Sequence, residues 1–247
     1  MNELFVFLVA FFAAAFGSVL GIGGGIFFVP FSTMFLSFPP SKAVPVSLAM
    51  VFTNAVSATF TRFRQESLQI GPNAWLGIAA IPSTLLGSLI GARLEAQTFR
   101  LLFSLFVISA AVFVFVKRPT VSIETRQKGR LARKLAVVVA AGFVSTLLGV
   151  GGGLIMVPAF IIWAKLDSHQ SVGTSQYVTA FATSTGLISY TVQGYSEPFL
   201  FVLASVGGFL GGMVGSRIEL RLSEKNLRKV IVVAFLAIGS CMIYSAL

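Results

Sequence analysis

The sequence predicts an all-α polytopic membrane protein built from two inverted repeats of about five helical segments each. Three observations lead to this fold class: an apolar composition, a glycine-rich element that occurs twice, and basic residues confined to short connections. In each repeat, a half-length helix that starts at the glycines is expected to meet its counterpart near the membrane midplane.

The composition excludes an ordinary soluble domain. Hydrophobic residues make up 56% of the 247 residues and charged residues 11%, and the mean hydropathy is +0.91. Soluble domains carry about 25% charged residues. Several apolar runs approach the roughly 20 residues that span a hydrocarbon core of about 30 Å. We therefore expect a chain that crosses a lipid bilayer several times.

The net charge of +10 has a membrane explanation. The basic residues lie in short connections between apolar runs, which is the distribution that the positive-inside bias produces. A nucleic-acid partner would instead favour a basic face on a folded domain. We therefore expect no nucleic-acid partner.

A ten-residue element occurs twice, 128 residues apart. Residues 21–30 read GIGGGIFFVP, and residues 149–158 read GVGGGLIMVP. A glycine run weakens a helix and exposes its backbone, so placing one at membrane depth twice is costly. Paired interruptions in matching halves are typical of the binding site of a transporter.

The duplication covers nearly the whole chain. It divides the sequence into a first membrane repeat, a basic cytoplasmic linker and a second membrane repeat, at 1–116, 117–134 and 135–247. The same offset pairs Ser47 with Ser175. After a shorter loop, GSLIGAR at 87–93 pairs with GGMVGSR at 211–217, and these G-x-x-x-G spacings are expected to be helix-packing faces.

The charge distribution distinguishes parallel from inverted repeats. With an odd number of membrane passes in each half, fifteen of the eighteen Lys and Arg residues share one side; the exceptions are Lys42, Arg93 and Arg100. With four passes in each half, the division is nine against nine. Because short cytoplasmic loops collect Lys and Arg, the inverted arrangement is predicted, with both chain termini on the non-cytoplasmic side.

The runs that follow the glycines, 26–38 and 154–164, are too short to span the hydrocarbon core. They are expected to be half-spanning helices that return to the side they came from. A helix that begins inside the membrane has free N–H groups and a positive dipole end, which favour an anion. The expected ligands at these starts are Gly23, Gly24, Gly25, Gly151, Gly152 and Gly153. The alternative is that the glycines only permit close helix packing.

The third apolar run of each half, at about 43–61 and 171–192, carries neutral polar side chains that could line the same anion. The candidates for substrate binding are Ser47, Asn54, Ser175, Gln176 and Thr179. Neutral donors can coordinate an anion without a full counter-charge. The alternative for all of them is hydrogen bonding between helices, which is the favoured interpretation for single Ser and Thr residues, whereas ligand binding is favoured for Asn54 and Gln176.

The acidic residues and the single histidine fall at or near the ends of apolar runs. We therefore expect no ionisable side chain at membrane depth of the kind that proton-coupled transporters use. The sequence also offers no His, Asp and Glu cluster and no Cys pair to hold a metal. The predictions are that the protein is not an enzyme and uses no metal or cofactor.

The twofold G-x-G-G-G-x-x-x-x-P element, the Gly173-Thr174-Ser175 segment and the later glycine-Arg ends resemble the sulfite exporter TauE/SafE family. These are small duplicated permeases, also described with toluenesulfonate uptake, and the resemblance covers essentially the full chain. It implies movement of sulfite, thiosulfate, sulfoacetate or another organosulfonate across a bacterial plasma membrane. The first half has Pro45-Val46-Ser47 where the second has Gly173-Thr174-Ser175, so exact symmetry of the site is not expected.

The predicted function is a secondary transporter for a small sulfur-containing anion, working by alternating access of the two halves. Two alternatives from other classes are a passive anion channel and a non-transporting membrane assembly subunit. The predicted partners are the anionic substrate and the lipid bilayer, and a homo-oligomer is left open.

Overall fold

The computed structural model describes residues 2–64, 74–116, 130–162, 168–219 and 221. These residues form helices joined by turns and bends, with no strand among them. The helices are α1 (Asn2–Val19), α2 (Gly25–Phe35), α3 (Pro40–Arg64), α4 (Leu76–Ala79), α5 (Ile81–Gly91), α6 (Ala96–Val116), α7 (Arg130–Leu148), α8 (Gly153–Ile162), α9 (Ser168–Val192) and α10 (Pro198–Glu219). Most of the predicted linker lies outside the described residues, as does the last apolar run at 227–246, and residues 130–134 of the linker form the start of α7.

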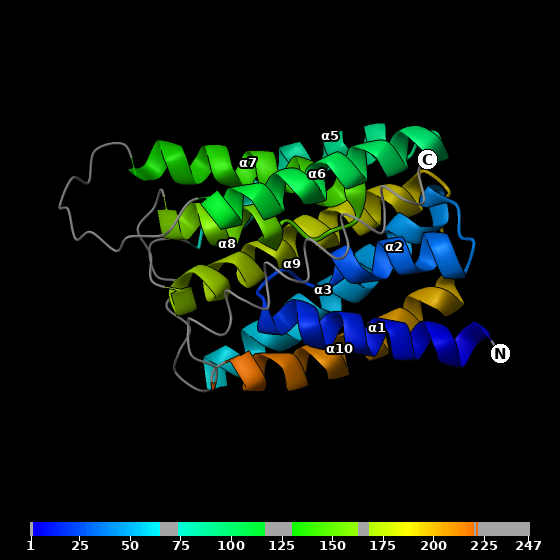
Figure 1. The fold of residues 1–247 in the computed structure, drawn as a ribbon, viewed down its shortest axis with the longest axis horizontal. Coiled ribbons are helices and arrows are strands. Elements are labelled where there is room, and N and C mark those ends of the chain that lie inside the picture. Colours follow the sequence, from blue (N-terminus) through cyan, green and yellow to red (C-terminus); the bar gives the residue numbers. More distant parts are fainter. Residues whose placement is uncertain (1, 65–73, 117–129, 163–167, 220, 222–247) are drawn as a thin grey trace.

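Two helix pairs turn back before they cross the molecule (Figure 1). α1 starts at the end that carries the N-terminus and α2 returns to that end, whereas α7 starts at the opposite end and α8 returns there. α2 has 11 residues and α8 has 10. At 1.5 Å per residue they are about 16 and 15 Å long, well short of a hydrocarbon core of about 30 Å. The half-length helices predicted after both glycine elements are therefore present.

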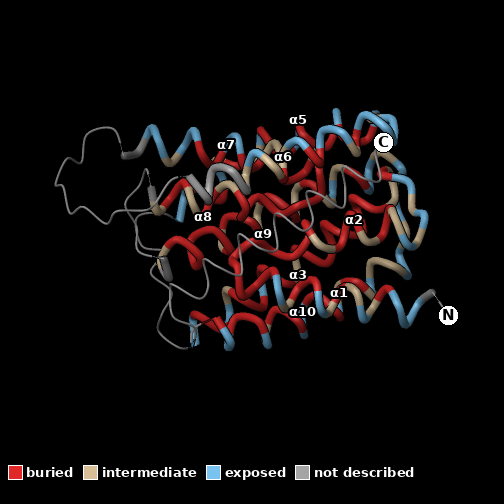
Figure 2. The backbone as a smooth tube through the Cα atoms, in the orientation of Figure 1, coloured by how far each residue is buried: buried red, intermediate tan, exposed pale blue. Residues whose placement is uncertain are grey.

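Two of the described helices, α3 and α10, are long and apolar enough to cross a membrane by length and composition. α3 and α9 lie in the interior, and Figure 2 shows them largely buried. The outer helices carry exposed large apolar side chains, including Phe12 on α1, Leu86 on α5 and Val202 on α10, and so do the ends of α3 and α9, at Phe63 and Val192. This distribution, with apolar side chains outside as well as inside, is the one a lipid environment permits.

Glycines let α10 pack its backbone directly on two neighbours. A Cβ atom on Gly211 or Gly215 would overlap carbonyl groups of α1, at Phe11 and Ala15. On another face, a Cβ atom on Gly208 would lie 2.7 Å from the hydroxyl oxygen of Thr53 on α3. The predicted packing role of the G-x-x-x-G spacing on this helix is confirmed.

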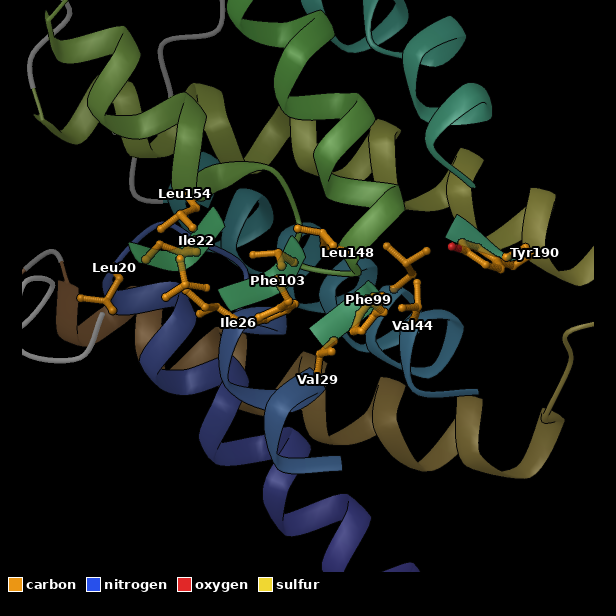
Figure 3. Close-up of a cluster of buried hydrophobic side chains, with 14 of the residues drawn as sticks. Leu20, Ile22, Ile26, Val29, Val44, Phe99, Phe103, Leu148, Leu154 and Tyr190 are labelled. Carbon is orange, nitrogen blue, oxygen red and sulfur yellow. The ribbon is translucent and has the colours of Figure 1, made fainter. Parts of the chain in front are cut away.

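A buried apolar cluster surrounds the two glycine elements (Figure 3). Ile22 and Ile26 at the first element lie in one cluster with Leu148 and Leu154 at the second. Phe103 of α6 belongs to the same cluster and is fully buried. Close packing of these side chains stabilises the arrangement through many weak dispersion contacts. The centre of the molecule is therefore the place where the two half-length helices begin.

Candidate functional site

The glycine runs adopt matching backbone conformations. Residues 21–25 and 149–153 together are called the glycine crossing below. Gly21 and Gly149 both have φ of 71°, and Gly23 and Gly151 both have φ of 91°. These angles lie in the left-handed region, which residues with a Cβ atom rarely adopt. The two turns end where α2 and α8 begin, at Gly25 and Gly153.

The two runs pack against each other. A Cβ atom on Gly25 would overlap the Gly149 carbonyl oxygen, and one on Gly153 would lie 2.8 Å from the Cα atom of Ile22. These are the contacts that the close-packing interpretation of the glycines expects. They also bring the N-terminal ends of α2 and α8 side by side. Among the described backbone hydrogen bonds, the N–H groups of Gly24 and Gly152 have no acceptor.

Side chains of α3 and α9 fill the space at the crossing. A Cβ atom on Gly23 would lie 2.8 Å from Val51 Cγ1 and 3.8 Å from Thr179 Cγ2. For Gly151 the corresponding distances are 2.6 and 3.6 Å. Val51 and Thr179 are related by the 128-residue offset and together contact both glycines. The crossing is therefore closed in this conformation.

The polar residues predicted on α3 brace the crossing. The Asn54 amide donates to the Gly23 carbonyl oxygen at 2.7 Å, and its own oxygen accepts from the Ser18 hydroxyl. The Ser47 hydroxyl donates to the Gly149 carbonyl oxygen at 2.7 Å, so it joins the two halves. Both side chains are fully buried. In this conformation their hydrogen bonds are used within the protein.

The polar residues predicted on α9 differ from one another. The Thr179 hydroxyl donates to the Gly151 carbonyl oxygen at 2.7 Å. The Ser175 hydroxyl and both polar atoms of the Gln176 amide are buried and have no hydrogen-bond partner. Three further hydroxyl oxygens are buried without a partner, at Thr59, Ser145 and Ser171, and were not predicted from the sequence. Ser171 lies one helical turn before Ser175, and that i, i+4 spacing is the signal that could have found it.

Other hydroxyl groups follow the interhelical alternative. Thr53 and Ser57 of α3 donate to carbonyl oxygens of α10, at Ser205 and Phe209, at 2.8 Å each. These bonds join helices and leave the hydroxyls no proton for a ligand. Their role here is packing, as expected for Ser and Thr in helix bundles.

A buried ion pair joins α3 to α10. Arg62 and Glu219 contact each other and are 0% and 1% exposed. The sequence predicts Glu219 near the end of an apolar run and Arg62 in a connection between runs, and both lie near the ends of their helices. Their burial is not predicted, because the two residues are 157 positions apart and nothing local links them. The other described pair, Lys42 with Glu197 at 2.9 Å, is partly exposed.

A cavity of about 370 Å³ opens at the end of α2. Its lining includes Thr33, Ser37 and Arg100, from α2, the turn that follows it and α6. Arg100 is one of the three basic residues assigned to the non-cytoplasmic side. Among the described residues, no group of three or more His, Cys, Asp or Glu side chains could hold a metal ion.

Comparisons with known proteins extend over both halves. The family profile described as sulfite exporter TauE/SafE matches residues 6–242. A probable membrane transporter protein of Bacillus subtilis, YunE, is 24% identical over 100% of this chain and 99% of its own length. A probable membrane transporter protein of Methanocaldococcus jannaschii is 27% identical over 90% of this chain and 88% of its own. For YfcA of Escherichia coli, also described as a probable membrane transporter, the values are 24%, 98% and 89%. No solved structure matches the chain.

Proposed function

Because the chain belongs to the sulfite exporter TauE/SafE family, we propose that it moves a small sulfur-containing anion across the plasma membrane by alternating access. Its family and relatives are those of membrane transporters. The proposal adds the substrate, which is sulfite, thiosulfate, sulfoacetate or a related organosulfonate, and the mechanism. It also takes the two halves as inverted repeats, with both chain termini outside the cytoplasm.

The observation that carries the proposal is the meeting of two helix starts at the glycine crossing. α2 and α8 both begin at the crossing and run toward opposite ends of the molecule. The N–H groups of Gly24 and Gly152, at these helix starts, have no backbone acceptor. Helix N-termini carry a partial positive charge of about half a unit each. Two such ends together attract one small anion without a buried cation. In inverted-repeat transporters, substrates bind at this kind of interface.

The neutral polar side chains complete the proposed site. Gly23, Gly25, Gly151 and Gly153 let a ligand approach the backbone, while Ser175 and Gln176 offer unpaired polar atoms. Ser47, Asn54 and Thr179 hold the glycine carbonyl groups in place and reach a ligand only if those bonds exchange. The predicted polar side chains are therefore proposed to fall into two groups: those that bind the anion and those that hold the glycine runs in position.

Alternating access requires a movement of α3 or α9. Val51 and Thr179 fill the crossing, so a substrate can enter only when these helices separate from the glycines. The cavity beside Arg100 is the proposed outer vestibule, because it lies at the end of α2 and contains a cationic side chain. A crossing that is closed in this conformation favours a carrier over a permanently open channel.

The direct test is uptake into liposomes that contain the purified protein. Labelled sulfite, thiosulfate and sulfoacetate are offered with and without an imposed pH gradient. Saturable uptake that the unlabelled anions inhibit is the expected result, and an effect of the gradient would establish proton coupling. Ohmic single-channel current would support the passive channel instead. No flux from folded protein that co-purifies with other subunits would support the assembly role.

The proposed orientation has its own test. A single cysteine at Asn2, in a chain where Cys241 is replaced by serine, is exposed to a membrane-impermeant maleimide in intact cells. The non-cytoplasmic assignment predicts labelling without permeabilisation. A matched cysteine at Arg64, on the side where the basic residues gather, should be labelled only after the cells are opened. The reverse pattern would overturn the assigned orientation.

A further inference from the structure

Gln176 is a buried side chain whose hydrogen-bonding groups have no partner. It is 1% exposed, and both its amide nitrogen and its amide oxygen are unpaired. The neighbouring Ser175 hydroxyl is also buried and unpaired. Buried polar groups are nearly always hydrogen-bonded, because an unpaired group loses its contacts with water and gains nothing in return. These atoms therefore call for a partner from outside the chain.

The helix register places Gln176 beside the glycine crossing. Val172 lies four residues before it and Thr179 three residues after it, so all three share one face of α9. Val172 would contact a Cβ atom on Gly21 at 2.8 Å, and Thr179 binds the Gly151 carbonyl oxygen. Gln176 thus lies between two residues that both contact the glycines.

The first half has no equivalent polar group. The 128-residue offset pairs Gln176 with Leu48, which lies in the apolar cluster and contacts Gly186. In the first half, a leucine packs at the equivalent position without any hydrogen-bonding group. The fold therefore does not need an amide at this place, and the amide is free to serve a ligand.

The charge around this position limits the ligand. The buried polar and charged side chains of the described residues include a single cation, Arg62, which already faces Glu219 near the ends of α3 and α10. Among the described residues, a doubly charged anion at the crossing would have only neutral donors and two helix ends to compensate it. A singly charged anion fits this environment at a smaller desolvation cost.

We propose that Gln176 and Ser175 recognise a singly charged oxyanion that itself carries a hydrogen-bond donor. The amide offers N–H donors to the anionic oxygens and a carbonyl oxygen that needs a donor in return. This holds for either orientation of the amide, since nitrogen and oxygen are both unpaired. The matching ligands are a protonated oxyanion, such as hydrogen sulfite, or a sulfonate that bears a hydroxyl or amino group. The inference rests on the proposed function and narrows its substrate class.

Two sulfonates that differ by one hydroxyl group test this selection. In proteoliposomes of the full chain, 2-hydroxyethanesulfonate and ethanesulfonate compete with labelled sulfite. The hydroxyl compound is expected to inhibit at a concentration about tenfold lower, because ethanesulfonate leaves the buried amide oxygen unpaired. Equal inhibition by the two compounds would overturn the proposal, and would assign the unpaired atoms to buried water.

A substitution at Gln176 separates recognition from folding. Gln176→Leu, which copies the first half, should abolish the tenfold preference while the melting temperature stays the same or rises. Gln193→Leu is the matched control, since that amide is bonded to Ser189 at the far end of α9, and it should keep the preference. A Gln176→Leu protein that melts earlier and keeps the preference would make Gln176 a structural residue.

The two proposals fail in different ways. If the unaltered protein transports sulfur anions without distinguishing the two sulfonates, the selection is wrong and the proposed function stands. If neither sulfite nor any sulfonate is transported by folded protein, the proposed function is wrong and the selection falls with it.

Discussion

The two halves of the molecule treat their polar side chains at the glycine crossing differently. In the first half, Asn54 binds the Gly23 carbonyl oxygen and Ser47 binds the Gly149 carbonyl oxygen. In the second half, Thr179 binds Gly151, but Ser175, the equivalent of Ser47, has no partner. The same duplicated backbone therefore carries a bonded set of side chains on one side and an incomplete set on the other. The difference indicates that the first half mainly holds the crossing together and the second half mainly recognises the ligand.

The largest expected effect comes from separating the two runs. Gly25→Leu or Gly153→Leu would push a side chain into the opposite run. Even a single Cβ atom added at Gly25 or Gly153 would lie within 2.9 Å of the Cα atom of Val150 or Ile22, respectively. Transport in liposomes should fall to background in both variants, because the helix starts can no longer meet. Val192→Leu, on a side chain that is 82% exposed, is the control for handling and reconstitution. Normal transport by either glycine variant would remove the crossing from the site.

The next largest effect is the loss of stability when the buried ion pair is broken, compared with the loss for the partly exposed pair. Glu219→Ala removes the carboxylate that faces the buried Arg62 guanidinium, which should cost about 3–5 kcal/mol of unfolding free energy. Glu197→Ala breaks a pair whose side chains are 31% and 44% exposed, and should cost at most about 1 kcal/mol. Thermal unfolding in detergent measures both. Equal shifts would contradict the burial of the α3–α10 pair.

Alanine at the third glycine of each run should show that the two turns are not equally crowded. A Cβ atom on Gly24 would meet the backbone of α1, 2.8 Å from the Ala13 carbonyl carbon, and backbone cannot move aside cheaply. A Cβ atom on Gly152 would meet the flexible end of Met156 at 2.9 Å. Both positions have positive φ, which costs a residue with a Cβ atom about 1–2 kcal/mol.

Gly24→Ala is therefore expected to destabilise the protein by about 3 kcal/mol, and Gly152→Ala by about 1–2 kcal/mol. Gly194→Ala, with positive φ and nothing within 4 Å of the added atom, isolates the backbone contribution. If Gly152→Ala proved the more damaging of the pair, the assigned contacts of the two turns would be reversed.

Local sequence was sufficient to predict the elements but not the pairing of their side chains. The repeated glycines and the shortness of the runs after them predicted α2 and α8, which begin at Gly25 and Gly153. Periodicity and composition are properties of a single segment, so they are sufficient to predict where each helix lies. Asn54 and Gln176 looked alike in the sequence, since both are amides on the third apolar run. Only the fold reveals that Ser18 and Gly23 occupy one amide and that nothing occupies the other.

The same limit applies to Arg62 and Glu219. Each is a charged residue near the end of an apolar run, and such residues usually face water or lipid headgroups. Their burial follows from α10 packing closely on α3 through its glycines, a contact between the two halves. A single sequence contains no local signal for a contact across so many positions.

The smallest expected effect is the difference in stability between substitutions of the two buried amides, Asn54 and Gln176. Asn54→Ala introduces the residue that occupies the equivalent position 182 in the second half, and it leaves the Gly23 carbonyl oxygen and the Ser18 hydroxyl without their partner. The expected loss is about 1–3 kcal/mol of unfolding free energy, since those groups remain buried. Gln176→Leu removes no hydrogen bond within the protein and should cost close to nothing. If instead both variants lowered the melting temperature equally, Gln176 would have a partner in the folded protein. The proposed difference between the halves, in which the first holds the crossing together and the second recognises the ligand, would then be wrong.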